Sequence, residues 1–289
     1  GFAKIAERAD LDAVIHLGDY IYEYGGEDSY GNQQLIESGV RAHLPAKEIV
    51  DLNEYRTRYS QYRLDPDLRR AHQQHPFITV WDDHESANDA YQDGAENHQP
   101  EEEGPWSTRK SISRQVYSEW MPVRGDLNSI PLYRTIKYGS LMDLIMLDTR
   151  LEDRVKQGMD VTSSELYSPE QTMLGSTQKA WMYEQLLNSE AKWKVIGNQV
   201  IFSPFNVWWA GLAPDSEATP LQLESLFLDI WDGYPTERDE IISFFADNAL
   251  DNLVILTGDF HSSLAFDVTA QPSPLSGNDP SIAVAGQVP

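Results

Sequence analysis

Five continuous apolar runs along the chain predict buried β-strands. They are Asp12–Leu17, Phe77–Trp81, Leu141–Leu147, Trp193–Val200 and Leu253–Thr257. Apolar residues follow one another in these runs instead of alternating with polar ones, which is typical of strands that are covered on both faces. Weaker strand patterns occupy Leu132–Tyr138, Leu264–Thr269 and Ile282–Val284.

Helical patterns lie between these runs. We expect helices over Phe2–Leu11, Ile49–Tyr62, Arg109–Trp120, Ser176–Glu190, with Ser176 as N-cap, and Pro235–Asn248. Gln99–Trp106 contains proline and glycine and predicts a surface loop. Strands that alternate with helices indicate a layered α/β fold. No shift in composition marks a boundary, so we expect a single domain over residues 1–289.

Composition and charge narrow the classes of function. The chain has 289 residues, of which 40% are hydrophobic, and it carries 46 acidic against 22 basic residues, a formal charge of −24. This charge repels phosphate at long range and argues against nonspecific binding to nucleic acid. No apolar run reaches the ~18 residues of a membrane span. There is no cysteine, so thiolate ligands are excluded, and no signal peptide is recognisable.

Acidic and polar residues follow four of the strong strands. The segments are "GDYIY" from Gly18, "WDDHESAND" from Trp81, "LDTR" from Leu147 and "LTGDFHSS" from Leu256. In open α/β sheets the functional site lies outside the carboxyl ends of the strands. We therefore expect these side chains to converge in one crevice, around cations that make buried carboxylates tolerable.

The chemistry of these residues predicts a metal centre. Asp19 is the expected centre because one carboxylate can bridge two cations, while Gly18 allows a tight turn as the strand ends. Tyr22 could ligate as a phenolate, which requires a strongly acidic metal such as Fe(III). The alternative is a packed tyrosine beside an aspartate in a turn.

The tandem aspartates Asp82 and Asp83 repel each other unless a cation is present. At least one should be a ligand, and the sequence leaves open which. His84 is a candidate ligand or proton donor. In an extended segment Asp259 and His261 would face the same cation. Carboxylates with imidazole suit iron, manganese or zinc, and calcium or magnesium where oxygens dominate.

Three further residues carry open alternatives. Arg150 could bind a phosphate oxygen or form an ion pair with Asp148, and the ion pair is favoured. Gln199 ends the fourth strand and could bind substrate or make a structural hydrogen bond. Asn88 is a neutral oxygen donor for substrate or metal, or a helix cap.

The motifs together resemble the PhoD-like alkaline phosphatase/phosphodiesterase family, from about Leu11 to His261. The resemblance rests on "HLGDYIYEYG", "WDDHESAND", "LYRTIKYGSLMDLIMLDTR", "MLGSTQKAWMYEQLL", "WKVIGNQVIFSP", "GYPTERDEI" and "LTGDFHSS". It implies a metallophosphoesterase-like α/β/β/α sandwich of two mixed β-sheets flanked by helices. It also implies metal-dependent hydrolysis of small phosphate esters, through a metal-bound hydroxide at a dinuclear site, outside the cytoplasm. The family's N-terminal strand and β-domain are expected to be absent from this chain.

The resemblance also assigns roles to the candidate residues. Asp19 would bridge the metals, Tyr22 would ligate iron, and Asp82 or Asp83 with Asp259 and His261 would complete the ligands. By analogy with the Gly-Asn-His-Glu motif of metallophosphoesterases, Asp83 takes the ligand position and His84 the transition-state position. The implied ions are Ca2+ and Fe3+. Zn2+ or Mn2+ are alternatives, because family members use a cysteine for iron and this chain has none.

Two rival functions remain open at this point. One is a non-catalytic metal- or carbohydrate-binding domain, suggested by aromatic residues such as Trp208 and Trp209. The other is a phospholipase-type diesterase of the same family. The sequence leaves the oligomeric state open.

Overall fold

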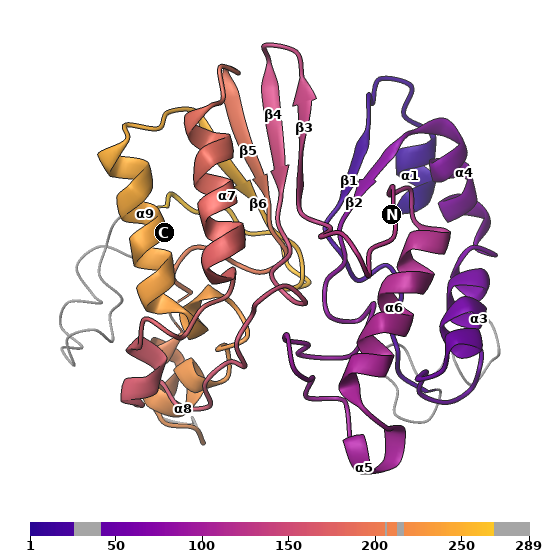
Figure 1. Cartoon of the computed structure of the whole chain (residues 1–289), viewed down its shortest axis with the longest axis horizontal. Coiled ribbons are helices and arrows are strands. Elements are labelled where there is room, and N and C mark those ends of the chain that lie inside the picture. Colours follow the sequence, from indigo (N-terminus) through magenta and orange to yellow (C-terminus); the bar gives the residue numbers. More distant parts are fainter. Residues whose placement is uncertain (26–41, 206, 213–216, 269–289) are drawn as a thin grey trace. The chain divides into compact units, whose positions relative to one another are not determined.

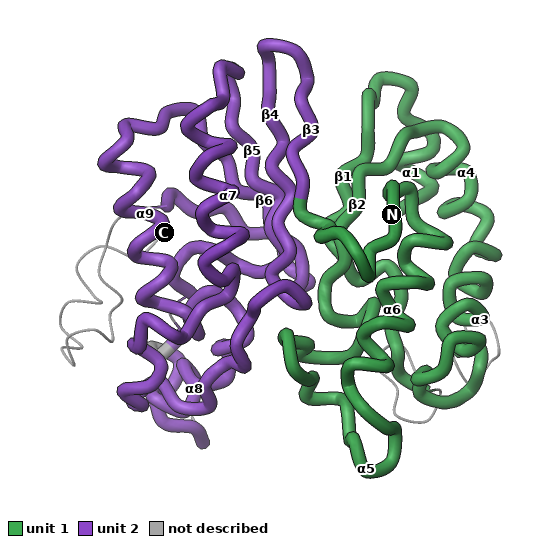
Figure 2. Tube along the Cα trace, in the orientation of Figure 1, with its two compact units in different colours: residues 1–133 green, residues 134–289 purple. Residues whose placement is uncertain are grey.

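The computed structural model describes residues 1–25, 42–205, 207–212 and 217–268. The chain divides into two compact units, residues 1–133 and residues 134–289 (Figure 2). The first unit contains a two-stranded sheet and the second a four-stranded sheet, and helices accompany both (Figure 1).

The first unit is built on two parallel strands. β1 (Val14–His16) pairs with β2 (Phe77–Thr79), and Ile15 lies opposite Ile78. The helices of this unit are α1 (Phe2–Ala6), α3 (Leu52–Tyr62), α4 (Pro66–Gln74), α5 (Pro100–Glu103) and α6 (Trp106–Trp120). Because β1 and β2 run in the same direction, the segments that follow them leave the sheet at the same edge.

Apolar and aromatic side chains hold this unit together. Ala6 and Ala71 pack with Phe77, which joins α1 and α4 to β2. Tyr117 on α6 meets Trp81 edge to face, with 5.2 Å between ring centroids. These contacts fix β2 and the residues after it against helices, so the loop that follows β2 starts from a rigid base.

The second unit contains a mixed sheet in the order β3–β4–β5–β6. Its strands are β3 (Arg134–Tyr138), β4 (Met142–Met146), β5 (Trp193–Gly197) and β6 (Leu253–Leu256). β3 is antiparallel to β4, whereas β4, β5 and β6 are mutually parallel. The carboxyl ends of these three strands therefore share one edge of the sheet.

Two long helices pack on this sheet. α7 (Gly175–Leu187) and α9 (Pro235–Asp247) supply Met182 and Ile241 to a core that also contains Ile145 and Ile196. Ile145, Ile196 and Ile255 are in register across β4, β5 and β6, so they form one apolar row. Shorter elements complete the unit: α8 (Pro220–Ser225) and the 3₁₀ turns Ser164–Tyr167, Trp208–Leu212 and Trp231–Gly233.

The sequence predicted the five strong strands, the strand over Leu132–Tyr138 and the long helices, with shorter bounds in most cases. Three expectations are wrong within the described residues. Residues 264–268 form no strand, Ser176 lies inside α7 with Leu174 as its N-cap, and Pro100–Glu103 is a short helix. Helix α4 was not predicted; it begins at Pro66, and proline is favourable at the first position of a helix. The segment Ile282–Val284 lies outside the described residues.

No helix in the part of the chain that the structure describes is both long and apolar enough to cross a bilayer.

The apolar row of the sheet yields a prediction about stability. Replacing Ile196, which is 3% exposed, by alanine removes buried methyl groups and leaves a cavity. We expect Ile196→Ala to lower the free energy of unfolding by about 2–5 kcal/mol in urea titrations. The control is Leu141→Ala, a residue that is 61% exposed, which should change stability by less than about 1 kcal/mol. Equal losses in the two variants would contradict this placement of the core.

Candidate functional site

In the first unit the loops after β1 and β2 lie side by side. Gly18 has φ +114°, and a Cβ at this position would collide with the backbone nitrogen of Asp82. Asp19 follows in a left-handed conformation, with φ 56°. Glycine therefore serves here both for its conformation and for its lack of a side chain, and the close approach brings Asp19 beside Asp82 and Asp83.

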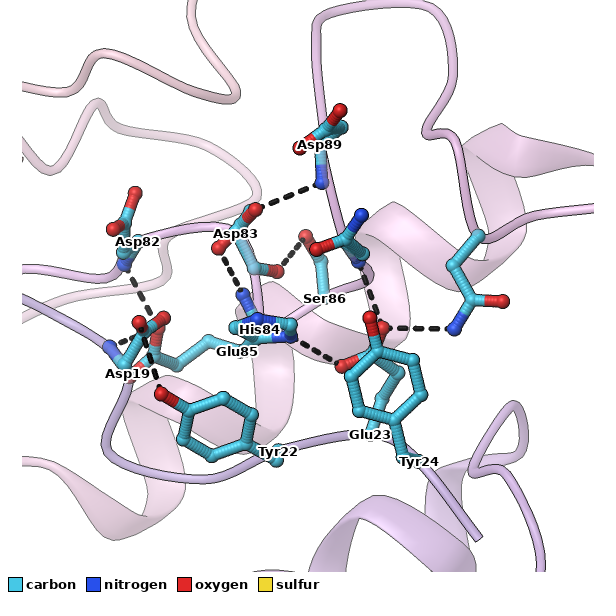
Figure 3. Close-up of polar contacts among 12 residues, drawn as sticks. Asp19, Tyr22, Glu23, Tyr24, Asp82, Asp83, His84, Glu85, Ser86 and Asp89 are labelled. Carbon is cyan, nitrogen blue, oxygen red and sulfur yellow. Dashed lines mark hydrogen bonds and ion pairs between the residues drawn. The ribbon is translucent and has the colours of Figure 1, made fainter. Parts of the chain in front are cut away.

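A buried carboxylate joins these two loops. Glu85 is 2% exposed and accepts hydrogen bonds from the backbone N–H groups of Asp19 at 3.1 Å and Asp82 at 2.8 Å (Figure 3). It also accepts one from the backbone N–H of Tyr20 at 2.6 Å. Burial raises the pKa of Glu85 to about 7, against the lowering effect of these N–H donors. Glu85 thus fixes the backbone from which two of the candidate ligands project.

Three aspartates form the centre of this site. Asp19, Asp82 and Asp83 each offer a carboxylate oxygen, and these oxygens lie within 4.8 Å of one another. Among the described residues no group donates a hydrogen bond to Oδ1 of Asp19, although this atom is buried. Burial, followed by the charges of Asp82 and Asp83, raises the pKa of Asp19 well above its ordinary value. Like charges held this closely favour a bound cation.

His84 is clamped at the side of this cluster. Its Nδ1 lies 2.7 Å from Oε2 of Glu23, and the rings of Tyr22 and Tyr24 lie 4.2 and 5.4 Å from its own, between centroids. Burial lowers the pKa of His84, but Asp83, Glu23 and the other acidic neighbours outweigh it and raise the pKa to about 10. Because Nδ1 faces Glu23, Nε2 is the nitrogen suited to a metal or a substrate. Asp19, Asp83 and His84 also offer ligand atoms within 4.8 Å of one another.

An arginine on helix α3 holds the loop that carries Tyr22 through hydrogen bonds to its backbone. Arg58 on α3 is fully buried and donates to the carbonyl oxygens of Tyr22 and Tyr24, the latter at 2.9 Å. The Tyr22 hydroxyl donates to Oδ2 of Asp19 at 3.3 Å. Burial and the charge of Asp19 raise the pKa of Tyr22, so a phenolate there depends on a nearby cation.

These residues fit a metal ion of the kind that oxygen donors prefer. The carboxylates supply several oxygens, as calcium and other hard cations require, and the imidazole of His84 adds a nitrogen that suits borderline metals. The buried Oδ1 of Asp19 is the observation that tests this fit, because a carboxylate oxygen removed from water needs a cation or a donor.

The second unit gathers its own group of polar residues at the carboxyl ends of β4, β5 and β6. Arg150 donates through Nη1 to both oxygens of Asp229 at 2.7 Å and through Nη2 to Oδ1 of Asp259 at 3.2 Å. Gln199 accepts from the backbone N–H of Thr149 at 3.0 Å. Within this unit, the segments that follow β4, β5 and β6 therefore lie together, while the convergence of all four strand ends in one crevice stays a prediction.

Several predicted residues occupy settings that the sequence did not indicate. β6 ends at Leu256, and Asp259 and His261 both have left-handed backbones, with φ 64° and 54°. The extended geometry that was expected to align them is therefore wrong. The guanidinium of Arg150 forms ion pairs with Asp229 at 2.7 Å and Asp259 at 3.2 Å, whereas Asp148, the predicted partner, accepts a hydrogen bond from the backbone N–H of Arg150 at 2.9 Å.

The two candidate substrate ligands are engaged in local hydrogen bonds. Gln199 is fully buried and donates to the carbonyl of Leu147 at 2.8 Å while it accepts from Thr149, which is the structural alternative. The side chain of Asn88 donates to Glu96 at 3.2 Å, and no described helix begins there. Their roles as substrate ligands stay predictions.

Three carboxylates that organise these groups were not assigned a role from the sequence: Glu23, Glu85 and Asp229. The sequence contains a weak indication of each of these three residues. Glu23 follows Asp19 by four positions, Glu85 belongs to the acidic motif after β2, and Asp229 stands between the apolar residues Leu228 and Ile230.

Comparisons with known proteins find relatives of this chain in both sequence and structure. A family model described as PhoD-like phosphatase matches residues 1–285. Alkaline phosphatase D of Bacillus subtilis (strain 168) is 38% identical over 272 residues, which is 91% of this chain and 43% of that protein. A solved structure described as "Structure of PhoD" matches with a TM-score of 0.75 and 36% identity, over 90% of this chain and 48% of that one.

These matches bear on the fold and on the extent of the chain. The described residues form a mixed α/β structure with two sheets flanked by helices, and the structural match supports the predicted metallophosphoesterase-like fold. The chain spans a little under half the length of the two relatives that it matches.

The close approach at Gly18 can be tested against a matched glycine. Gly18→Ala adds a Cβ to a positive φ and places it against Asp82, whereas Gly104→Ala meets the same kind of backbone penalty, at φ +82°, with no atom within 4 Å. We expect Gly18→Ala to lose clearly more unfolding free energy than the ~1–3 kcal/mol of a strained conformation alone, and Gly104→Ala to lose about that amount. Similar losses in urea titrations of the two variants would show that the two loops are not in contact.

Proposed function

The chain belongs to the PhoD-like phosphatase family, and we propose that it hydrolyses phosphate esters as a metal-dependent phosphatase or phosphodiesterase. The observation that carries this proposal is the buried cluster of Asp19, Asp82 and Asp83, with Oδ1 of Asp19 lacking a hydrogen-bond donor among the described residues. The family membership supports the chemistry, and the cluster supports its location.

We assign the metal ligands of the first unit to these aspartates, with Asp19 as the bridge of a dinuclear site and Tyr22 as a further donor. Bound metal ions would supply Lewis acidity, which neutralises phosphoryl charge and lowers the pKa of water. Ca2+ with Fe3+ are the proposed ions, and Zn2+ or Mn2+ are the alternatives because the chain has no cysteine.

His84 has the features of a group that acts on the leaving oxygen. The carboxylate of Glu23 orients its ring, two tyrosine rings flank it, and the charges of its acidic neighbours raise its pKa above the ordinary value. A protonated imidazole in hydrogen-bond reach of the departing oxygen can donate a proton or stabilise the charge that develops there.

The second unit is proposed to contribute Asp259 and His261 as further ligands. This part of the proposal is supported by the family motif Gly258–His261 and by the chemistry of its side chains. We further propose that residues 1–289 form one catalytic domain. By the family resemblance, we also propose that the enzyme acts outside the cytoplasm.

The bridging role of Asp19 predicts opposite effects on the metal-bound and metal-free protein. Asp19→Asn removes one of three repelling charges, so the metal-free variant should be at least as stable as the metal-free parent. The stabilisation gained on adding metal, about 2.7 kcal/mol at 100 times Kd for the parent, should largely disappear, together with hydrolysis of p-nitrophenyl phosphate. The control is Asp93→Asn, which changes an exposed aspartate. This variant should keep both the stabilisation by metal and the hydrolysis of p-nitrophenyl phosphate. Unaltered metal content and turnover in Asp19→Asn would remove Asp19 from the site.

Removal of metal separates the proposed enzyme from its rivals. We expect EDTA to abolish hydrolysis of p-nitrophenyl phosphate and bis-p-nitrophenyl phosphate, and added Ca2+, Fe3+, Zn2+ or Mn2+ to restore it to different extents. A protein that binds calcium but shows no chelator-sensitive hydrolysis of any ester would be a binding domain. Turnover confined to phospholipid diesters would identify the phospholipase-type alternative.

A further inference from the structure

The guanidinium of Arg150 joins two carboxylates that are distant in the sequence. Arg150 follows β4 and is fully buried. Its Nη1 contacts both oxygens of Asp229 at 2.7 Å, while its Nη2 contacts Oδ1 of Asp259 at 3.2 Å. The Nη1 side of the forked guanidinium is thus fixed by short contacts to Asp229, and its Nη2 side reaches Asp259, the proposed metal ligand.

A second arginine shares the same anchor. Arg154 donates through Nη2 to the carbonyl oxygen of Asp229 at 2.9 Å and to its carboxylate, and through Nε to the hydroxyl of Tyr234 at 3.0 Å. Asp229 therefore faces two buried guanidinium groups with a single negative charge. Because an uncompensated buried charge is costly, the carboxylate of Asp259 contributes a further negative charge beside these two guanidinium groups.

The backbone at Asp259 is fixed by independent contacts. Asp259 and its neighbour two positions on, His261, adopt left-handed conformations that cost roughly 1–2 kcal/mol each in residues other than glycine. The N–H of Gly258 donates to the carbonyl of Gln199 at 2.7 Å, and the ring of Phe260 meets that of Phe205 with 4.6 Å between centroids. The backbone is thus held by the segment after β5 and by aromatic packing, and Arg150 holds the side chain.

We propose that Arg150 is a positioning residue that acts through Asp259 rather than on the substrate. Asp229 anchors its guanidinium, and the guanidinium holds Oδ1 of Asp259 so that the carboxylate is oriented to bind a metal ion. The inference rests on the proposed function, in which Asp259 is a ligand. It requires a planar fork that reaches two carboxylates at once, which lysine cannot provide.

The test compares metal affinities of the whole chain, measured by calorimetry with Mn2+ alone. Asp229→Asn removes the charge that anchors Arg150, and Arg150→Lys keeps the charge but removes the fork. We expect each to weaken Mn2+ binding by about 10- to 100-fold, as is usual when a partner of a ligand is changed. The matched control is Asp251→Asn, an exposed aspartate paired with Lys194, which should bind Mn2+ like the parent.

A double-mutant cycle distinguishes positioning from general damage. In an Asp259→Asn background, Asp229→Asn should weaken Mn2+ binding no further, because the side chain on which it acts has been removed. In the metal-free protein, hydrogen exchange of the peptide that contains residues 257–263 should be faster in Asp229→Asn than in the parent.

The outcomes separate this inference from the proposed function. Unchanged Mn2+ affinity in Asp259→Asn would overturn the assignment of Asp259 as a ligand and the positioning role with it. Weakened binding in Asp259→Asn, together with parental affinity in Asp229→Asn and Arg150→Lys or with additive losses in the double mutant, would overturn the positioning role alone. Should circular dichroism show that Asp229→Asn is unfolded, Arg150→Lys and its own cycle with Asp259→Asn decide the question.

Discussion

Repulsion among the carboxylates of Asp19, Asp82 and Asp83 is the constraint on which the first unit depends. Three acidic side chains with oxygens within 4.8 Å of one another are unfavourable where water has little access. The unit keeps them there because Glu85 ties both loops through backbone N–H groups and Gly18 permits the contact. The fold thus holds a site that is electrostatically strained without a cation, and the strain itself creates affinity for one.

The second unit also holds buried carboxylates in place, and there neutral amides and charged side chains have different roles. Neutral amides hold the backbone of the loop after β4: Gln178 accepts from the N–H of Asp148 and donates to its carbonyl, both at 2.8 Å, and Gln199 bonds to Thr149. Charged groups appear at the tip of the loop, where Arg150 connects Asp229 to Asp259. Amides can fix a buried backbone without adding charge, which leaves the electrostatics of the tip to the arginines and carboxylates.

Features that depend on neighbouring residues could be predicted from the sequence. Features that depend on a partner far along the chain could not. Continuous apolar runs located the strands, and the acidic residues after them include the clustered Asp19, Asp82 and Asp83. The role of Glu85 depends on backbone atoms 65 and 66 positions earlier, and that of Asp229 on an arginine 79 positions away, so no local pattern contains them. The left-handed turn at Asp259 is likewise imposed by tertiary contacts, since neither it nor His261 is a glycine.

The buried arginines bear on how so acidic a chain could accept a phosphate ester. Five are fully buried among the described residues: Arg58, Arg109, Arg150, Arg154 and Arg238. Each has carbonyl or carboxylate partners inside its own unit, such as the carbonyl of Tyr24 for Arg58, Glu48 for Arg109 and Asp232 for Arg238. Their positive charge is thus largely balanced by the fold. In a chain of net charge −24, attraction for a phosphate would then depend chiefly on the cations that we propose for the aspartates, and the acidity that repels phosphate from the surface would also concentrate metal at the proposed site.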